Sequence, residues 1–113
     1  MKQTAKDLRR ALALLERDGW RQNFFGPPER GIREPRCAGG ACMAVAPTLA
    51  RYAFACHALR RALPPSAPRY TGTYYRSFVR CFDTIAAYND HPGRRFSTIQ
   101  RWFKRAIAAE EGL

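Results

Sequence analysis

The stretch that decides the fold is YNDHPGRRFSTIQRWFKRA, residues 88–106. It joins a polar corner, residues 89–97, to a basic segment whose apolar residues recur every three or four positions. That spacing gives a helix with one apolar face, formed by Ile99, Trp102, Phe103, Ala106 and Ile107. Ser97 and Gln100 have the spacing of a capping box, which predicts that the helix begins there. The segment therefore predicts a capped helix that closes a small hydrophobic core.

The same periodicity predicts helices elsewhere in the chain. One covers residues 5–18, with Thr4 and Asp7 spaced as a capping box and Gly19 as its terminator. Residues 37–63 are also helical in pattern, and Pro47 either kinks one long helix or stands in the first turn of a second. A further helix is predicted over residues 73–88, with its apolar stripe at Tyr75, Phe78, Phe82 and Ile85.

Two segments interrupt this pattern. Residues 20–36 are rich in Gly and Pro and have no period, which leaves room for a short strand pair around Phe24, Phe25 and Ile32. Residues 64–72, PPSAPRYTG, form a rigid connector, because the halves on either side are too short to be separate domains. We therefore expect a single all-α domain over residues 1–113. It would be a compact bundle of four to five helices with one Gly/Pro-rich loop, with or without a short β-hairpin.

The chain is strongly basic, with 20 Lys and Arg residues, 9 Asp and Glu residues and a net charge of +11. The codon bias of a high-GC genome would explain the preference for Arg over Lys, but it does not explain the shortage of acidic residues. Such an excess favours nucleic acid or an acidic protein surface as partner. The N-terminal residues lack the apolar region of a signal peptide, and no run could span a membrane. We therefore expect a cytoplasmic protein with reduced cysteines and no membrane partner.

The last two predicted helices raise the question of a DNA-reading helix pair. Such a pair is normally joined by a turn of about three or four residues, and residues 89–96 are a longer connection. Trp102 and Phe103 also have the positions of core residues, not of base readers. The pattern favours electrostatic contact with an anionic partner, weighed against a merely solvated basic face. The residues expected to make that contact are Arg76, Arg80, Arg94, Arg95, Arg101, Lys104 and Arg105.

A cysteine nucleophile is a second possibility for chemistry. Cys37 stands before AGGA, where a helix is expected to begin. The helix N-terminus and Arg36 would both lower the pKa of its thiol. His91 could act as the base, with Asp90 orienting it. Against this hypothesis, adjacent residues rarely hold a histidine and its own carboxylate in a working geometry, and buried cysteines at tight helix entries are common.

The cysteines and histidines do not have the spacing of a metal site. Strong zinc motifs place paired ligands two to four residues apart, twice over. Cys37 and Cys42 are slightly too far apart, Cys56 beside His57 is poorly suited to chelation, and Cys81 falls at the edge of an apolar helical stripe. Neither a metal nor a cofactor is expected.

Three short motifs, in order along most of the chain, resemble a family of small uncharacterised proteins from high-GC bacteria and their phages. Their positions here are Gly19, Trp20 and Gln22; Cys37, Gly40 and Ala41; and Tyr88, Asn89, Asp90, Gly93 and Arg94. The sequence departs from the family pattern at Tyr88, where Trp is expected, and by an insert-like PPSAPRYTG. The family has no assigned activity.

The resemblance implies an organisation. Trp20 and the Asn89–Asp90 corner would be structural partners, and one pocket would be surrounded by Trp20, Gln22, Cys37, Asn89 and Asp90. Asn and Asp at such a corner can hydrogen-bond to loop amides.

The leading hypothesis is a small basic accessory protein of phage or mobile-element type. It would bind nucleic acid or an acidic protein surface through its Arg-rich face. Two alternatives stay open at this point: a thiol-dependent enzyme that uses Cys37 with His91, and a stoichiometric inhibitor of a host or defence protein.

Overall fold

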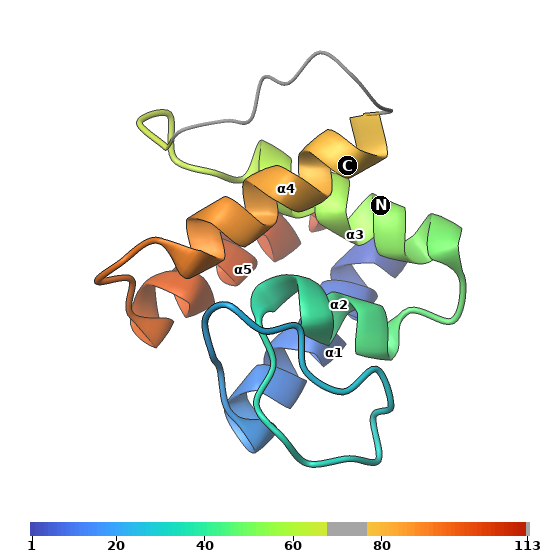
Figure 1. The fold of residues 1–113 in the computed structure, drawn as a ribbon. Coiled ribbons are helices and arrows are strands. Elements are labelled where there is room, and N and C mark those ends of the chain that lie inside the picture. The colour runs from blue at the N-terminus through green and yellow to red at the C-terminus, as the bar shows by residue number, and fades with distance from the viewer. Residues whose placement is uncertain (68–76, 113) are drawn as a thin grey trace.

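The described part of the chain forms helices, and one long loop connects the first two of them (Figure 1). The computed structural model describes residues 1–67 and 77–112, and of residues 77–81 it describes the backbone alone. The helices are α1 (Lys2–Asp18), α2 (Ala38–Val45), α3 (Leu49–Arg61), α4 (Ser77–Asp90) and α5 (Phe96–Glu111). The all-α class and the helical bundle predicted from the sequence are confirmed. In the described residues, no helix is long and apolar enough to cross a membrane.

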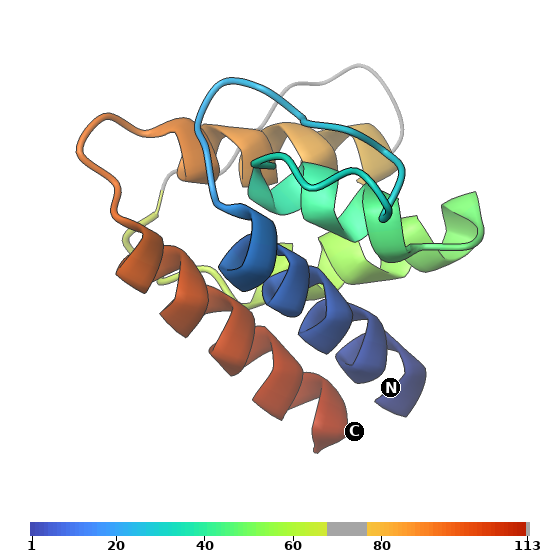
Figure 2. The same cartoon turned by 90° about the horizontal axis from the view of Figure 1, so that it is seen from below.

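Helices α1 and α5 lie side by side and run in opposite directions (Figure 2). At one end of the pair, Gln100 Nε2 donates to Glu16 Oε2 at 3.0 Å. At the other, the amino group of Met1 donates to the carbonyl of Glu110 at 2.8 Å. The predicted capping box in α5 is therefore wrong. The helix begins at Phe96, its cap position is Arg95, and the Gln100 side chain bonds to the neighbouring helix because α1 offers a carboxylate there.

The apolar face of α5 closes the core, as the sequence predicts. Trp102 and Phe103 are completely buried. The Trp102 indole donates to the carbonyl of Leu59 in α3 at 2.7 Å and meets the ring of Tyr88 in α4 edge-on, with centroids 4.7 Å apart. The polar edge of the indole is thus satisfied inside the core, which makes its burial favourable.

The N-terminal helix begins earlier than predicted. α1 starts at Lys2, so Thr4 and Asp7 lie within the helix and the capping box predicted for them is wrong. Both are buried, and Asp7 accepts two hydrogen bonds from the guanidinium of Arg51 in α3, at 2.6 and 3.0 Å. A buried carboxylate needs such a partner. The end of α1 is as predicted: Gly19 has a φ of 106°, and its amide bonds to the carbonyl of Leu15.

The other helix boundaries resolve the alternatives that the sequence leaves open. Pro47 lies between α2 and α3, so it neither kinks a long helix nor enters the next one. Thr48 caps α3 by accepting from the amide of Arg51 at 3.2 Å. α4 extends to Asp90, two residues beyond the prediction, and residues 73–76 of that prediction lie outside the described residues.

The long loop between α1 and α2 carries no β-hairpin. In the described residues the sole β-type pairing is an isolated parallel bridge between Trp20 and Arg36, which closes the loop at its base. There the amide of Arg21 bonds to the carbonyl of Arg36 at 3.0 Å, and the amide of Arg36 to the carbonyl of Gly19 at 3.1 Å. The strand pair allowed around Phe24, Phe25 and Ile32 does not form.

A buried arginine organises this loop instead. The guanidinium of Arg36 donates to the carbonyls of Pro27, Glu29 and Ile32 at 2.7–2.9 Å, and to the carboxylate of Asp18 at 2.8 Å. One side chain thus satisfies three loop carbonyls that a hairpin would have paired with a strand.

The carboxylate that anchors Arg36 is held by several cations. Hydrogen bonds from Arg17 first, then from Arg36 and Arg33, keep the pKa of Asp18 well below its ordinary value. A lowered pKa means that the anchor stabilises the fold above the unfolded pKa of about 4. That contribution is lost as the pH falls through the folded pKa.

The entry of α2 imposes a strict demand on Gly40. A Cβ on Gly40 would lie 1.7 Å from the carbonyl oxygen of Phe25, whereas a Cβ on Gly39 would meet Phe82 at 3.4 Å, an ordinary contact. We expect Gly40→Ala to cost about 3 kcal/mol or more, because backbone must move to relieve the overlap. Gly39→Ala is the matched control and should be neutral or stabilising, since alanine favours a helix over glycine by about 1 kcal/mol. Urea unfolding of both variants checks this, and equal stabilities would contradict it.

Candidate functional site

A buried asparagine forms the corner between α4 and the turn that follows. Asn89 is completely buried, and its side-chain oxygen accepts from the Trp20 indole at 2.7 Å and from the amide of Ala38 at 3.0 Å. Its amino group donates to the carbonyl of Arg21 at 3.1 Å and to Asp90 Oδ1 at 2.8 Å. All four side-chain hydrogen-bonding positions are therefore filled. Through them Asn89 links α4 to the long loop and to the first turn of α2.

Two further side chains fasten the same loop to the corner. Gln22 Nε2 donates to the carbonyls of Asn89 and His91, at 3.1 and 2.8 Å. Asp90 Oδ1 accepts from the backbone amide of Asn23 at 2.8 Å. Trp20, Gln22, Asn89 and Asp90 are thus brought together from segments about 70 positions apart, as the resemblance implies for structural partners.

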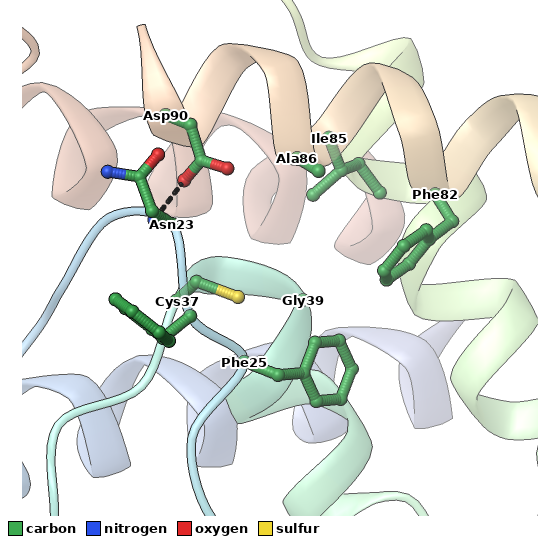
Figure 3. Close-up of a pocket in the computed structure, with 9 residues that line it drawn as sticks. Asn23, Phe25, Cys37, Gly39, Phe82, Ile85, Ala86 and Asp90 are labelled. Carbon is green, nitrogen blue, oxygen red and sulfur yellow. Dashed lines mark hydrogen bonds between the residues drawn. The ribbon is translucent and has the colours of Figure 1, made fainter. Parts of the chain in front are cut away.

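Next to this corner lies an aromatic cleft of about 150 Å³. Loop residues 23–25, the first turn of α2 and the inner side of α4 form its walls (Figure 3). The residues that line it are Asn23, Phe24, Phe25, Cys37, Gly39, Phe82, Ile85, Ala86 and Asp90. Of the five residues predicted to surround a pocket, Cys37 and Asp90 line the cleft. Trp20, Gln22 and Asn89 instead hold its walls in place.

Cys37 caps α2 and turns its sulfur into the cleft (Figure 3). The sulfur accepts from the amide of Gly40 at 3.3 Å, and the residue is 8% exposed. Burial, above all, raises the pKa of this thiol, and the charge of Asp90 adds to the rise, against a smaller lowering by the Gly40 amide. The lowered pKa expected from the sequence is therefore wrong. The Arg36 guanidinium is bound to the loop and Asp18, and burial outweighs the helix N-terminus.

His91 does not share the cleft with Cys37. It is exposed after the end of α4, its Nδ1 lies 2.9 Å from the carbonyl of Pro92, and it lines a separate hollow with Tyr88 and Arg94. The structure therefore does not show the thiol–imidazole pair of the enzyme hypothesis. Asp90 directs one carboxylate oxygen to the Asn23 amide, not to the imidazole of His91.

The basic residues named from the sequence divide into three groups. Arg95, Arg101, Lys104 and Arg105 are exposed at the start and along the outer side of α5. Arg94 is half-buried, because its guanidinium covers the ring of Tyr88 at 3.8 Å and donates to the Tyr88 carbonyl at 2.9 Å. Arg76, and the side chain of Arg80, lie outside the described residues.

The structure adds a second row of cations that the sequence analysis missed. Lys2, Lys6, Arg9, Arg10 and Arg17 are exposed on α1, the helix that lies beside α5 (Figure 2). Arg10 and Arg17 also line a shallow groove of about 440 Å³ with Arg30, over Leu14 and Val45. Their helical spacing was visible in the sequence, but nothing in it paired α1 with α5.

The acids, in contrast, are turned inward. The carboxylates of Asp7, Asp18 and Glu110 are 0–3% exposed and each binds at least one cation. These carboxylates are buried, but several of their partners, including Arg17, Arg33 and Arg61, are about half exposed or more. On α1, Arg9, Arg10 and Arg17 each have a carboxylate within 4 Å, whereas in the described residues Lys2, Lys6, Arg101, Lys104 and Arg105 have none.

The described residues hold no group of three or more His, Cys, Asp or Glu side chains that could bind a metal ion. Cys37, Cys42 and Cys56 are buried, reduced thiols, and the side chain of Cys81 lies outside the described residues. Burial raises the pKa of Cys42 well above its ordinary value.

The Asn89 corner predicts a large stability effect. Asn89→Ala should lower the free energy of unfolding by about 3 kcal/mol, because the Trp20 indole, the Ala38 amide and the Arg21 carbonyl lose their partner. Gln22→Ala is the control and should cost about 1 kcal/mol, since water can reach the His91 carbonyl. Urea denaturation measures the free energy of unfolding of both variants. A larger loss of stability in Gln22→Ala than in Asn89→Ala would contradict the prediction.

The raised pKa of Cys37 predicts slow alkylation at neutral pH. The iodoacetamide rate at Cys37 in the folded chain should be lower than in urea, and should still be rising at a pH above the ordinary thiol pKa of about 8.5. Peptide mapping by mass spectrometry assigns the label to each cysteine. A Cys37 that reacts faster folded than unfolded at pH 7 would contradict the buried thiol and revive the enzyme hypothesis.

The sequence and the comparisons agree on an uncharacterised family. A family of unknown function, DUF6197, matches residues 1–109. No curated protein and no solved structure matches the chain. The bacterial and phage origin suggested by the sequence motifs stays a prediction. Since the match spans almost the whole chain, this protein belongs to the family of unknown function DUF6197.

Proposed function

We propose that this protein binds nucleic acid through the outward face of α1 and α5, and that it holds phosphates without reading bases. One observation carries the proposal, namely the unbalanced charge of this face. The exposed residues of the two helices include eight cations and two acids. The cations are Lys2, Lys6, Arg9, Arg10, Arg17, Arg101, Lys104 and Arg105; the acids are Glu16 and Glu111.

Carboxylates neutralise only part of this face: Arg9, Arg10 and Arg17 lie within 4 Å of Glu111, Asp7 and Asp18, and in the described residues the other five cations have no such partner. Glu111 is paired with Arg9, and Glu16 accepts a hydrogen bond from Gln100. The carboxylates of Asp7, Asp18 and Glu110 lie inside the protein. A face of this kind attracts a polyanion over a distance and binds it by releasing condensed counterions.

The shape of the face also suits a phosphate backbone. Arg101, Lys104 and Arg105 lie at helical spacings of three and four, which places them on one edge of α5. Exposed alanines, Ala13 in α1 and Ala108 in α5, leave the surface between the cations low. The groove along α1 that contains Arg10, Arg17 and Arg30 continues the basic surface towards the loop.

The geometry of α5 argues against base reading. Its aromatic residues, Trp102 and Phe103, are completely buried. The turn between α4 and α5 has five residues, 91–95, which is shorter than the sequence predicts but longer than the usual turn of a DNA-reading pair. The basic edge therefore supports contacts to phosphates, which position a protein without specifying sequence.

An acidic protein surface is the second partner that the charge would suit, and the test below separates it from nucleic acid. For the thiol enzyme, the raised pKa of Cys37 and the separate position of His91 supply no support. A stoichiometric inhibitor stays an untested alternative.

Nucleic-acid binding by this face predicts a steep salt dependence. The affinity for a fluorescent DNA duplex should fall by about 10³-fold or more between 50 and 200 mM salt if about six phosphates are contacted. Arg101→Gln combined with Lys104→Gln should weaken binding about tenfold or more at low salt and lower the slope against log salt by about 2. Fluorescence anisotropy measures both quantities.

The matched control removes the same charge elsewhere. Arg21→Gln combined with Arg33→Gln lowers the net charge equally and removes no cation of α1 or α5, so it should bind DNA nearly as the wild type does. Arg33 is one of three arginines on Asp18, and Arg17 and Arg36 still hold that carboxylate in the variant. Equal losses in the two double variants would refute a specific face. If the protein binds poly-glutamate tightly and does not bind DNA, the partner of this face is an acidic protein surface and not nucleic acid.

A further inference from the structure

We propose that the aromatic cleft binds a small organic cation, consisting of one aromatic ring and a protonated amine, with Asp90 as its counter-ion. The site is independent of the basic face, because its walls come from the loop, α2 and α4 and not from the outer sides of α1 and α5. The site is the cleft beside the Asn89 corner, and its ligand class is an aromatic amine.

The size and lining of the cleft select a single ring. A cavity of about 150 Å³ lined by apolar side chains is known to hold one benzene ring, and the volume here is about 150 Å³. The Phe25 and Phe82 rings contact each other, with centroids 5.7 Å apart and planes inclined at 47°, and lie together at the end of the cleft away from Asp90 (Figure 3). Ile85 and Ala86 form the α4 side (Figure 3).

The charge at one end of the cleft selects a cation. Asp90 is the sole ionisable carboxylate among the lining residues. One of its oxygens, Oδ1, already accepts from the Asn23 amide and the Asn89 side chain. The other accepts no hydrogen bond from a described residue, and Figure 3 shows it turned away from Asn23 on the side of Ala86. That oxygen is available to a ligand donor.

Asp90 differs from the buried acids of this protein in a way that supports this role. Asp7, Asp18 and Glu110 each have a cation within 4 Å. In the described part of the chain, Asp90 has none. It is a carboxylate held in place by neutral donors in a protein with a large surplus of arginine. The missing charge partner is supplied, in our proposal, by the ligand.

The aromatic walls suit a cation as well as a ring. A cation over the face of an aromatic ring is attracted by the quadrupole of the ring, most strongly where water is excluded. One face of Phe24 already shows this preference, because the guanidinium of Arg21 lies 4.3 Å from its centroid. Aromatic rings and one carboxylate together therefore favour an aromatic amine over a neutral or acidic ring of equal size.

The test uses benzylamine, which is protonated at neutral pH, and benzyl alcohol, its neutral equivalent in size. Each is titrated into the ¹⁵N-labelled full chain and followed by amide shifts. We expect saturable shifts confined to the lining segments around residues 23–25, 37–39 and 85–90. Benzylamine should bind about tenfold more tightly than benzyl alcohol, because one contact between opposite charges away from water raises the affinity by about that factor. Benzylamine should also slow alkylation of Cys37.

Three variants separate charge from shape. Asp90→Asn keeps an oxygen for the Asn23 amide but removes the charge, so the two probes should bind within about twofold of each other. Gly39→Ala places a methyl group 3.4 Å from Phe82 and 3.5 Å from Phe25, and should weaken both probes several-fold without lowering the melting temperature. Ala86→Leu fills the same cleft from α4 and should have the same effect.

The proposal fails if benzyl alcohol binds the wild type as tightly as benzylamine, if no saturable shift appears, or if Asp90→Asn retains the preference for the amine. DNA affinity should be the same in wild type and in the three cleft variants. Loss of the nucleic-acid function would leave the amine titration unchanged, so the two proposals can be rejected separately.

Discussion

The Asn89 side chain is the contact on which the rest of the architecture depends. It joins the end of α4 to the loop that follows α1 and to the first turn of α2, about 50 to 70 positions earlier in the sequence. Its two acceptor bonds and two donor bonds are all made in a completely buried position. A buried amide with every bond satisfied specifies one arrangement, because any shift leaves a polar group without a partner. The corner thus fixes the long loop and the cleft that the loop encloses.

A second constraint is the way the few acids are used. Asp7 links α1 to α3, Glu110 holds the Met1 amino group and Arg61, and Asp18 anchors the arginine that shapes the loop. Each carboxylate is buried and paired with at least one cation, although Arg51, Arg61 and the Met1 amino group stay partly exposed; removal of the cation would leave a buried charge without a partner. The consequence for function is indirect. Acids used inside the fold are missing from its surface, so the α1–α5 face keeps its positive charge.

The proposed activities lie on different parts of the molecule. The basic face belongs to the helix pair α1 and α5, while the cleft belongs to the loop, α2 and α4. The cleft is nearly apolar and carries one carboxylate, which is unusual in so basic a chain. The two proposals therefore place a surface for a polyanion and a pocket for a small cation on different elements of one small chain.

Periodicity alone determined the helices that bury an apolar stripe, including the buried positions of Trp102 and Phe103, because the helical repeat fixes which residues share a face. The family resemblance, and not the helical periodicity, predicted that Trp20 and Gln22 lie near the Asn89–Asp90 corner. The sequence motifs predicted the wrong partners for polar side chains that can bond to several groups. Gln100 bonds to Glu16, Asp7 to Arg51 and Arg36 to the loop carbonyls. The pKa of the Cys37 thiol was mispredicted for the same reason, since burial and competing bonds outweighed the neighbours in the chain.

Local sequence thus determined the helices and their inner faces. Tertiary structure alone decided the partners of the polar groups, the pairing of two basic helices and the cleft, because those depend on segments that meet after folding.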